Sequence, residues 1–375
     1  MHEEAPRPAT RALRQRTTIN DVARTAGVSK ATVSRYVNGG DTLLAPETAA
    51  RVAHAMQQLG YHPSPMAQSL KHGRTRLIGL AVADITNPFS VAVMQGAERA
   101  CQEAGYLLVL FNLGNAAERE RGVLRALQTS QLDGLILNRA TATGQLRQLA
   151  LDAGKPIVLV DRRQPGLEAD FISVDNRGAM ALLLEHLARR GWRRFVLVSE
   201  PSAGVSSRIA RQQAFHDWLA HPPAGAEGCT GVHLEVPRGA QEECRVQLQR
   251  WHAQQTAGAK KKGGGDVEGG CAIVTGNAVA TLLAASAARD LGWQLGRDVG
   301  FAGIDETDWT ALIGPGLTTI AQPTDELGRE AVRCLLERLE GDMRPARTIE
   351  LPGRLVERAS SAVWEGGGNR LGARP

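Results

Sequence analysis

Four side chains that can donate hydrogen bonds lie close together near the N-terminal end of this 375-residue sequence: Lys30, Thr32, Ser34 and Arg35. Val33 and Val37 are four residues apart, so a helix here would bury both valines and leave the donors facing outward. Outward ammonium, hydroxyl and guanidinium groups are those that bind phosphate oxygens and base edges in nucleic acids. Arg35 is expected to read a base directly, because a guanidinium can pair bidentately with guanine and contribute about 1–3 kcal/mol of discrimination.

Three short helices are expected around these donors. Thr18 begins an S/T-x-x-D pattern typical of a helix N-terminus, and Gly27 ends that helix. Ser29 can cap the second helix, and Pro46 occupies the first position of the third. Two short helices joined by a tight glycine-containing turn can lay the second helix in the major groove of DNA. The same pattern is compatible with a small helical bundle whose polar face is merely solvated.

The positive charge of the chain is concentrated at this end. Up to Arg76 there are eleven Lys and Arg residues against five Asp and Glu, a net charge of +6, so the remainder of the +5 chain carries −1. Only the N-terminal part therefore has the charge typical of a surface that binds nucleic acid. Residues 1–16 contain arginines but no apolar run that resembles a secretion signal, which predicts a disordered basic arm.

Signals for several other classes of protein are missing from the sequence. No stretch approaches the roughly 18 uncharged apolar residues of a membrane span, so we expect a cytoplasmic protein with no membrane partner. The five cysteines are far apart and never form a C-x-x-C pair, so they are expected to be small buried residues without a metal. No phosphate-binding loop, nucleophile elbow or dinucleotide-binding glycine motif is present, so neither an enzyme nor a cofactor is expected.

After Arg76 short apolar, β-rich runs alternate with amphipathic helices. This alternation predicts doubly wound, mostly parallel sheets with helices on both faces, and the number of units suits two lobes. The expected helices include 89–104, 116–129 and 178–190, and the expected buried strands are 77–83, 107–111, 135–137, 157–160, 195–198, 271–274 and 299–302. Residues 221–270 interrupt the pattern and are expected to end in an exposed flexible loop that contains the lysine run 260–262.

Polar residues come directly after several of these strands. Ligands of open α/β sheets bind outside the carboxyl ends of the strands, and in a two-lobed protein they bind between the lobes. Carboxylates, amides and an aromatic face suit a polyhydroxylated ligand, whose hydroxyls both donate and accept hydrogen bonds. The candidate residues are Asp84, Asn87, Phe89, Asn138, Asp161, Arg162, Asn277 and Asp305.

Residues 18–38 carry the most specific pattern in the chain. TINDVARTAGVSKATVSRYVN resembles, nearly residue for residue, the T-I-x-D-V-A-x-x-A-G-V-S-x-x-T-V-S-R pattern of the lactose-repressor (LacI/GalR) family. The resemblance extends to about Arg358 and implies a bacterial transcription regulator. It implies a helix-turn-helix headpiece at 17–61, a hinge at 62–76, a two-lobed α/β effector-binding and dimerisation domain of the periplasmic-binding-protein type at 77–360, and a disordered tail at 361–375.

The resemblance also implies which residues contact DNA. The family's base-reading positions fall on Lys30, Ala31 and Arg35, and its backbone-contacting positions fall on Thr18, Ser29, Thr32, Ser34 and Asn38. In the family the linker forms a hinge helix on operator DNA and inserts a leucine into the minor groove, and that leucine matches Leu70. Ser64 and Gln68 replace the usual Asn and Arg, so hinge contacts to DNA are expected to be weaker, and a purely structural Leu70 is the alternative. A homodimer would read a pseudo-palindromic operator with one headpiece per half-site.

For the effector, the resemblance supports Asn277 and Asp305 and adds Arg211, which stands at the arginine of the family's R-x-x-G-[FYW] motif. Ala278 replaces the aspartate of an N-D pair, so one polar partner is missing. Arg162 and Arg211 together would favour a carboxylate over a neutral hydroxyl. We therefore predict a sugar acid of the gluconate or 2-ketogluconate type, with a neutral sugar or a purine as alternatives. Arg162 as a surface residue is the structural alternative.

A periplasmic sugar-binding protein would share the two-lobed body and is the remaining competing class. It would need a signal peptide and would have no use for residues 18–60. Both features favour a DNA-binding regulator, and the family makes repression the expected action.

Overall fold

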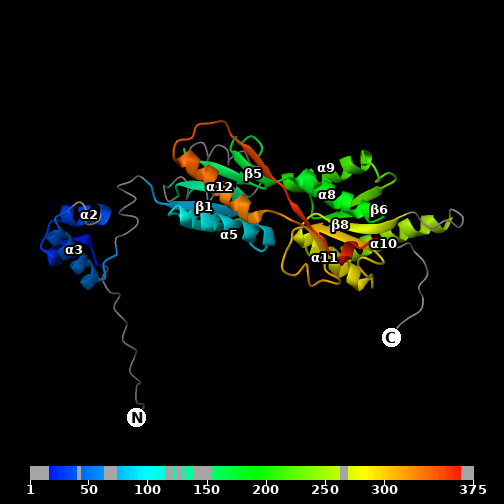
Figure 1. The fold of residues 1–375 in the computed structure, drawn as a ribbon, viewed down its shortest axis with the longest axis horizontal. Helices are drawn as coiled ribbons and strands as arrows, with labels where there is room; N and C mark the ends of the chain where they lie inside the picture. Colours follow the sequence, from blue (N-terminus) through cyan, green and yellow to red (C-terminus); the bar gives the residue numbers. More distant parts are fainter. Residues whose placement is uncertain are drawn as a thin grey trace, which may run out of the picture. The chain divides into compact units, whose positions relative to one another are not determined.

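The computed structural model describes residues 17–39, 44–62, 74–114, 122, 125, 129, 132–138, 154–261 and 269–364. The chain divides into two compact units, residues 1–75 and residues 76–375 (Figure 1). The expected basic arm, the greater part of the expected hinge with Leu70, and residues 365–375 of the expected tail lie outside the described residues.

The described residues of the first unit form three helices, α1 (Ile19–Ala26), α2 (Lys30–Gly39) and α3 (Pro46–Leu59). The Thr18 backbone N–H and hydroxyl donate to the Asp21 carboxylate at 3.0 and 2.7 Å, which fixes the start of α1. Gly27 has a φ of 66°, a left-handed conformation that ends α1 and that glycine adopts without strain. The three helices predicted from the sequence are confirmed, with Pro46 at the first position of α3.

A small apolar core holds the three helices together. Val22, Val33 and Val52 come from different helices and are all 0% exposed. Val37 is partly buried against the same cluster, so the prediction that Val33 and Val37 face inward is confirmed. Because one side of α2 is used by this core, its polar side remains available for contacts outside the unit.

The second unit contains two lobes, and each is built on a six-stranded sheet (Figure 1). The first sheet has the order β2-β1-β3-β4-β5-β11, and all of its neighbouring strands are parallel. Its strands are β1 (Leu77–Val82), β2 (Leu107–Asn112), β3 (Gly134–Asn138), β4 (Ile157–Val160), β5 (Asp170–Val174) and β11 (Thr348–Leu351).

The second sheet repeats this strand order as β7-β6-β8-β9-β10-β12 and differs in one pair, because β12 runs antiparallel to β10. Its strands are β6 (Trp192–Ser199), β7 (Thr230–Glu235), β8 (Gly270–Thr275), β9 (Gly300–Ile304), β10 (Thr318–Ala321) and β12 (Arg354–Val356). The chain passes between the lobes after β5, after β10 and after β11. The expected α/β class with two doubly wound, mostly parallel sheets is confirmed.

Helices cover the sheets and bury their apolar faces. In the first lobe α5 (Pro88–Glu103) and α12 (Thr324–Leu339) pack on each other and on the sheet, and a Cβ atom at Gly96 would collide with the backbone of Asp325. In the second lobe α8 (Asn176–Arg189) and α9 (Ser206–Ala220) enclose one core, whereas α10 (Gln241–Lys261) and α11 (Ala278–Asp290) enclose another. A 3₁₀ turn follows at Ala359–Ser361.

Several details differ from the sequence-based expectations. Residues 221–261 are more regular than expected, because they contain β7 and the 21-residue helix α10, and Lys260 and Lys261 belong to that helix. Most of the helix expected at 116–129 lies outside the described residues. The five cysteines are all buried, as predicted.

Candidate DNA interface and effector site

The residues expected to contact DNA lie on and beside α2. Lys30, Ala31 and Arg35 are exposed, whereas Thr32 and Ser34 are half-buried. The hydroxyl of Ser29 accepts a hydrogen bond from the Thr32 backbone N–H at 3.1 Å and lies 2.9 Å from the Thr32 hydroxyl. Ser29 therefore caps α2, and the exposed positions of the helix begin directly after it.

The remaining expected DNA contacts are Thr18, Asn38 and Leu70. Thr18 is exposed at the start of α1, where its hydroxyl is bound to Asp21. The backbone of Asn38 is part of α2, but its side chain is not among the described parts of the chain. Leu70 lies wholly outside the described residues.

In the second unit, the expected effector residues after β1 have partners of their own. Asp84 accepts hydrogen bonds from the Thr86 backbone N–H and hydroxyl, both at 2.8 Å, and forms an ion pair with Arg238 of the second lobe. The Asn87 side chain accepts from the Phe89 backbone N–H at 3.1 Å and caps α5. Phe89 is 7% exposed and packs in the core of the first lobe, so its ring is mostly occupied by protein contacts.

Asp161 and Arg162 follow β4 at the junction of the two lobes. The Ser207 hydroxyl of α9 donates to Asp161 Oδ2 at 3.2 Å, which links the lobes directly. Arg162 Nε lies 3.7 Å from the same oxygen and is buried without a hydrogen-bond partner within the described part of the chain. Asn138 is buried beside this segment, where its amide donates to the Val160 carbonyl oxygen at 3.0 Å.

Arg211 is buried on α9 and is held by neutral acceptors. Its Nε donates to Asn176 Oδ1 at 2.7 Å, and Nη1 donates to the Gly276 carbonyl oxygen at 2.6 Å. Its Nη2 makes a longer contact of 3.4 Å with Gln322 Oε1. These partners fix the plane of the guanidinium without neutralising its charge.

Asp305 is connected to Arg211 through Gln322. The Gln322 amide donates to Asp305 Oδ1, and the Ala278 backbone N–H donates to Oδ2 at 2.8 Å. Burial raises the pKa of Asp305 above its usual range, and the charge of Arg211 and the two hydrogen bonds oppose that shift. A continuous set of hydrogen bonds therefore joins the carboxyl ends of β8 and β9 to α9.

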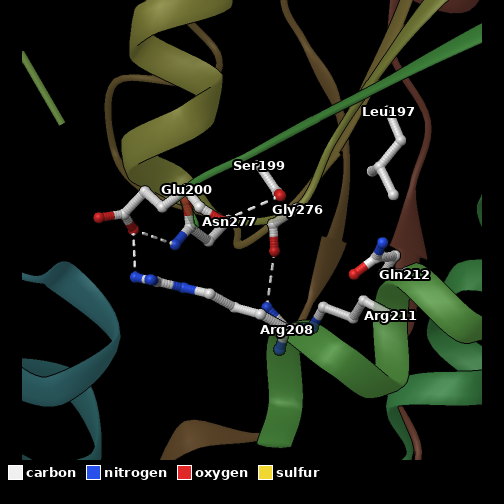
Figure 2. Close-up of a pocket in the computed structure, with 8 residues that line it drawn as sticks. All are labelled: Leu197, Ser199, Glu200, Arg208, Arg211, Gln212, Gly276 and Asn277. Atoms are coloured by element: carbon white, nitrogen blue, oxygen red, sulfur yellow. Dashed lines mark hydrogen bonds and ion pairs between the residues drawn. The ribbon is translucent and has the colours of Figure 1, made fainter. Parts of the chain in front are cut away.

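The structure adds two residues that the sequence analysis did not single out, Arg208 and Glu200 (Figure 2). Arg208 Nη2 donates to Glu200 Oε2 at 2.6 Å, and the Asn277 amide donates to the same oxygen at 2.8 Å. Arg208 precedes Arg211 by three residues on α9, a spacing that puts both on one side of a helix. That spacing is the signal by which Arg208 could have been found.

The cluster around Arg208 is rich in guanidinium groups. Burial lowers the pKa of Arg208, Glu200 opposes this shift, and the nearby charges of Arg162 and Arg211 add to it. The pocket beside this cluster is largely filled by its own side chains and leaves about 10 Å³ of free space. Its lining residues are Leu197, Ser199, Glu200, Arg208, Arg211, Gln212, Gly276 and Asn277 (Figure 2).

The described residues contain no group of three or more His, Cys, Asp or Glu side chains placed to hold a metal ion. Among the helices described, none is long and apolar enough to span a membrane.

Models of known protein families match both units of the chain. Residues 18–64 match the model of bacterial regulatory proteins of the lacI family. Residues 75–227 match the model of periplasmic binding proteins and sugar binding domain of LacI family, and residues 184–361 match a periplasmic binding protein-like domain. A helix-turn-helix headpiece joined to a two-lobed binding domain defines a class of ligand-responsive DNA-binding proteins.

Proteins of similar sequence or structure indicate more closely which kind of DNA-binding protein this is. The HTH-type transcriptional regulator PtxS of Pseudomonas aeruginosa is 46% identical over 93% of this chain and 96% of its own length. KdgR, an HTH-type transcriptional regulator of Bacillus subtilis, is 36% identical over 92% and 97%. The lac repressor dimer bound to operator and the anti-inducer ONPF has the same fold, with a TM-score of 0.76, 23% identity, and coverage of 93% of this chain and all of that one. The chain belongs to the lacI family and is a DNA-binding transcription regulator.

Proposed function

We propose that this regulator responds to a small polyhydroxylated carboxylate, of the gluconate or 2-ketogluconate type, bound where the two lobes meet. The observation that carries the proposal is the buried Nε of Arg162, which has no hydrogen-bond acceptor in the described chain and lies beside two more arginines. A buried donor without an acceptor costs about 1–3 kcal/mol, so a ligand oxygen at this position would be strongly favoured.

The rest of the cluster supports a charged ligand. Arg211 is 6% exposed and its hydrogen-bond acceptors are all neutral, so its charge is compensated only at longer range. Burial also raises the pKa of Asp305, and the charge of Arg211 opposes that shift. Arginine presents its donors as a planar fork that matches the two oxygens of a carboxylate.

The hydroxyl groups of the ligand would bind to the polar residues at the strand ends. Asn138, Asn277 and Asp305 each bring acceptors or donors to the carboxyl edge of a sheet, where ligands of this architecture bind. Asp84 and Asn87 stay in the proposed site as residues at its edge, and Phe89 contributes through packing beneath it. A neutral sugar or a purine would use the amides and would bring no negatively charged acceptor to Arg162 or Arg211.

For DNA, the proposed base-reading residues are Lys30, Ala31 and Arg35, and the proposed backbone contacts are Thr18, Ser29, Thr32, Ser34 and Asn38, with Leu70 as a minor-groove wedge. The exposure of Lys30, Ala31 and Arg35 on α2 supports this assignment. A homodimer supplies two headpieces for a pseudo-palindromic operator. Leu107 on the edge strand β2 and Leu282 on α11 are exposed apolar residues that a dimer interface would cover.

Isothermal titration calorimetry tests the effector class. Gluconate is compared with glucitol, and 2-ketogluconate with fructose, because each pair differs only by a carboxylate in place of a hydroxymethyl group. We expect binding of at least one acid and not of its neutral analogue, and loss of that binding in Arg162→Gln. Arg163→Gln is the matched control, since the Arg163 guanidinium instead stacks 4.0 Å from the Phe171 ring.

Two outcomes would count against the proposal. Equal binding of glucitol and gluconate, or binding of hypoxanthine with neither acid, would show that the carboxylate is not recognised. Unchanged acid affinity in Arg162→Gln would remove Arg162 from the site.

A further inference from the structure

The side-chain carboxylate of Glu200 is held by the same kinds of donor that would bind the carboxylate of a ligand. Its Oε2 accepts from a guanidinium, that of Arg208, and from an amide, that of Asn277. We infer, resting on the proposed function, that Glu200 occupies the carboxylate position of the effector site when no effector is bound and that the effector carboxylate displaces it from Arg208. Glu200 is then the residue that makes the site selective for acids.

The position of Glu200 in the fold suits this role. It comes directly after β6, at the carboxyl edge of the sheet, and its side chain is only 12% exposed, with Arg208 at 18%. Figure 2 shows Arg208 extending across the pocket to one carboxylate oxygen of Glu200, while the other oxygen is directed away from both donors. The ion pair therefore lies within the pocket rather than on the outer surface.

The side chain of Glu200 can leave without a change in the backbone. The Ser199 hydroxyl donates to the Glu200 carbonyl oxygen at 3.0 Å, and Ser199 also contacts His233 Nε2 at 2.7 Å. These contacts hold the main chain at residue 200, so the exchange requires only rotation about side-chain bonds. Such rotations are rapid compared with movements of whole lobes.

Charge balance explains why displacement is expected instead of simple addition. A ligand carboxylate that joined Glu200 at Arg208 would place two anions on one partly buried guanidinium, where repulsion is poorly screened. Exchanging one carboxylate for the other keeps the charge of the cluster constant. A neutral hydroxyl cannot drive this exchange, because it would leave the partly buried guanidinium of Arg208 without the opposite charge that Glu200 supplies.

The test is a double-mutant cycle measured by calorimetry with gluconate and 2-ketogluconate on the full-length protein. Glu200→Gln removes the competing charge and is expected to tighten acid binding about tenfold, the scale of one charge-assisted hydrogen bond. In an Arg208→Gln background the same substitution is expected to have no effect, because the shared partner is absent. The neutral analogue, glucitol or fructose, should show no binding to either variant, as expected for the wild type.

A matched control separates competition from general electrostatics. Glu235→Gln removes another carboxylate of this lobe, one that binds Ser202 outside the pocket, and should leave acid affinity unchanged. If Glu200→Gln does not fold, Glu200→Ala repeats the measurement with the same expected direction.

Three results would overturn the inference. Weaker acid binding in both Glu200 variants would make Glu200 a direct ligand of the effector. If Glu200→Gln tightened acid binding equally in the presence and absence of Arg208, Glu200 would act by repelling the acid through space and not by competing for Arg208. A wild-type protein that binds neither acid would overturn the proposed function and the exchange with it, whereas the first two results leave the proposed function intact.

Discussion

Asp161 and Asp305 hold the same position in the two lobes of the binding domain. Asp161 follows β4 and Asp305 follows β9, and both have left-handed backbones, with φ of 64° and 84°. Their backbone N–H groups donate to Ile172 in β5 at 2.8 Å and to Ile320 in β10 at 3.1 Å. Two sheets of the same strand order therefore each present one buried aspartate at the carboxyl edge where a ligand is proposed to bind.

The left-handed backbone at Asp305 leads to a stability prediction. Asn adopts positive φ with little strain and can keep the acceptor for the Ala278 N–H, whereas Ala does neither. Asp305→Ala should therefore lower the free energy of unfolding by about 1–2 kcal/mol more than Asp305→Asn. Urea unfolding of the two variants measures the difference, and equal stability would mean that the backbone at this position relaxes.

Most of the buried strands were predictable from the sequence, and so was the edge strand β2. The buried strands β5 and β10 were missed, as were the edge strands β7, β11 and β12. Strands such as β4 and β8 are continuous apolar runs with every residue buried, so their pattern is strong. β7 and β11 alternate exposed and half-buried residues over only 6 and 4 positions, which is too short a pattern to distinguish from a loop. The helix α10 was missed because most of its residues are polar.

The candidate site was predicted only in part. Strand ends identify Asp161, Arg162 and Asp305, because parallel strands bring their carboxyl ends to one edge. They do not identify Arg208, which lies on a helix that packs over this edge. The burial of Phe89 depends on α12, which is more than 200 residues away in the sequence, so local pattern could not reveal it.

Base readout by Arg35 predicts a loss of both affinity and specificity. Arg35→Ala should weaken binding to the preferred DNA by about 5- to 150-fold, equivalent to about 1–3 kcal/mol, and relax the preference for one base pair. The preferred sequence is first selected from a random DNA library, and binding is then followed by fluorescence anisotropy. Arg24→Ala is the control, because Arg24 is exposed on α1 and pairs with Asp21. A loss that is equal for all sequences would make Arg35 a phosphate contact.

The ion pair between Asp84 and Arg238 joins the two lobes at their surface. Burial alone would raise the pKa of Asp84, but hydrogen bonds from Thr86 and the charge of Arg238 hold it below its usual range. Because exposed pairs contribute about 0–1 kcal/mol, Asp84→Asn or Arg238→Gln should weaken effector binding by no more than about fivefold.

A double-mutant cycle with Asp84 and Arg238 checks this interpretation by calorimetry, and the two effects should not add. High salt should reduce wild-type affinity towards that of the variants. Arg177→Gln is the control, because the Arg177–Asp217 pair lies within the second lobe. Additive effects would mean that the two residues act separately.

Asp170 is expected to stabilise the first lobe. Its side chain is 1% exposed and forms ion pairs with Arg338 and Arg347 at 2.9 and 3.0 Å. Burial by itself would raise the pKa of Asp170, but hydrogen bonds from the two arginines hold it far below its ordinary value of 3.8. Breaking a buried pair costs about 3–5 kcal/mol, so Asp170→Asn should lower the free energy of unfolding by about that amount at neutral pH.

The pH dependence of this effect has a definite sign. A carboxylate with a lowered pKa contributes fully above the pKa of the unfolded chain and loses its contribution as the pH falls towards the folded value. The stability difference between wild type and Asp170→Asn should therefore shrink below pH 3.8. If this stability difference stayed constant as the pH fell, the lower stability of Asp170→Asn would come from packing and not from charge.

The coupling between effector and DNA is the central claim, and operator binding in the presence of effector tests it most directly. Fluorescence anisotropy of the selected DNA is measured with increasing gluconate or 2-ketogluconate, and with glucitol or fructose. We predict that one acid changes operator affinity by about 5- to 150-fold, the usual range of allosteric coupling, and that its neutral analogue does not. Operator affinity that is insensitive to both acids, or that responds equally to the neutral analogue, would contradict the account.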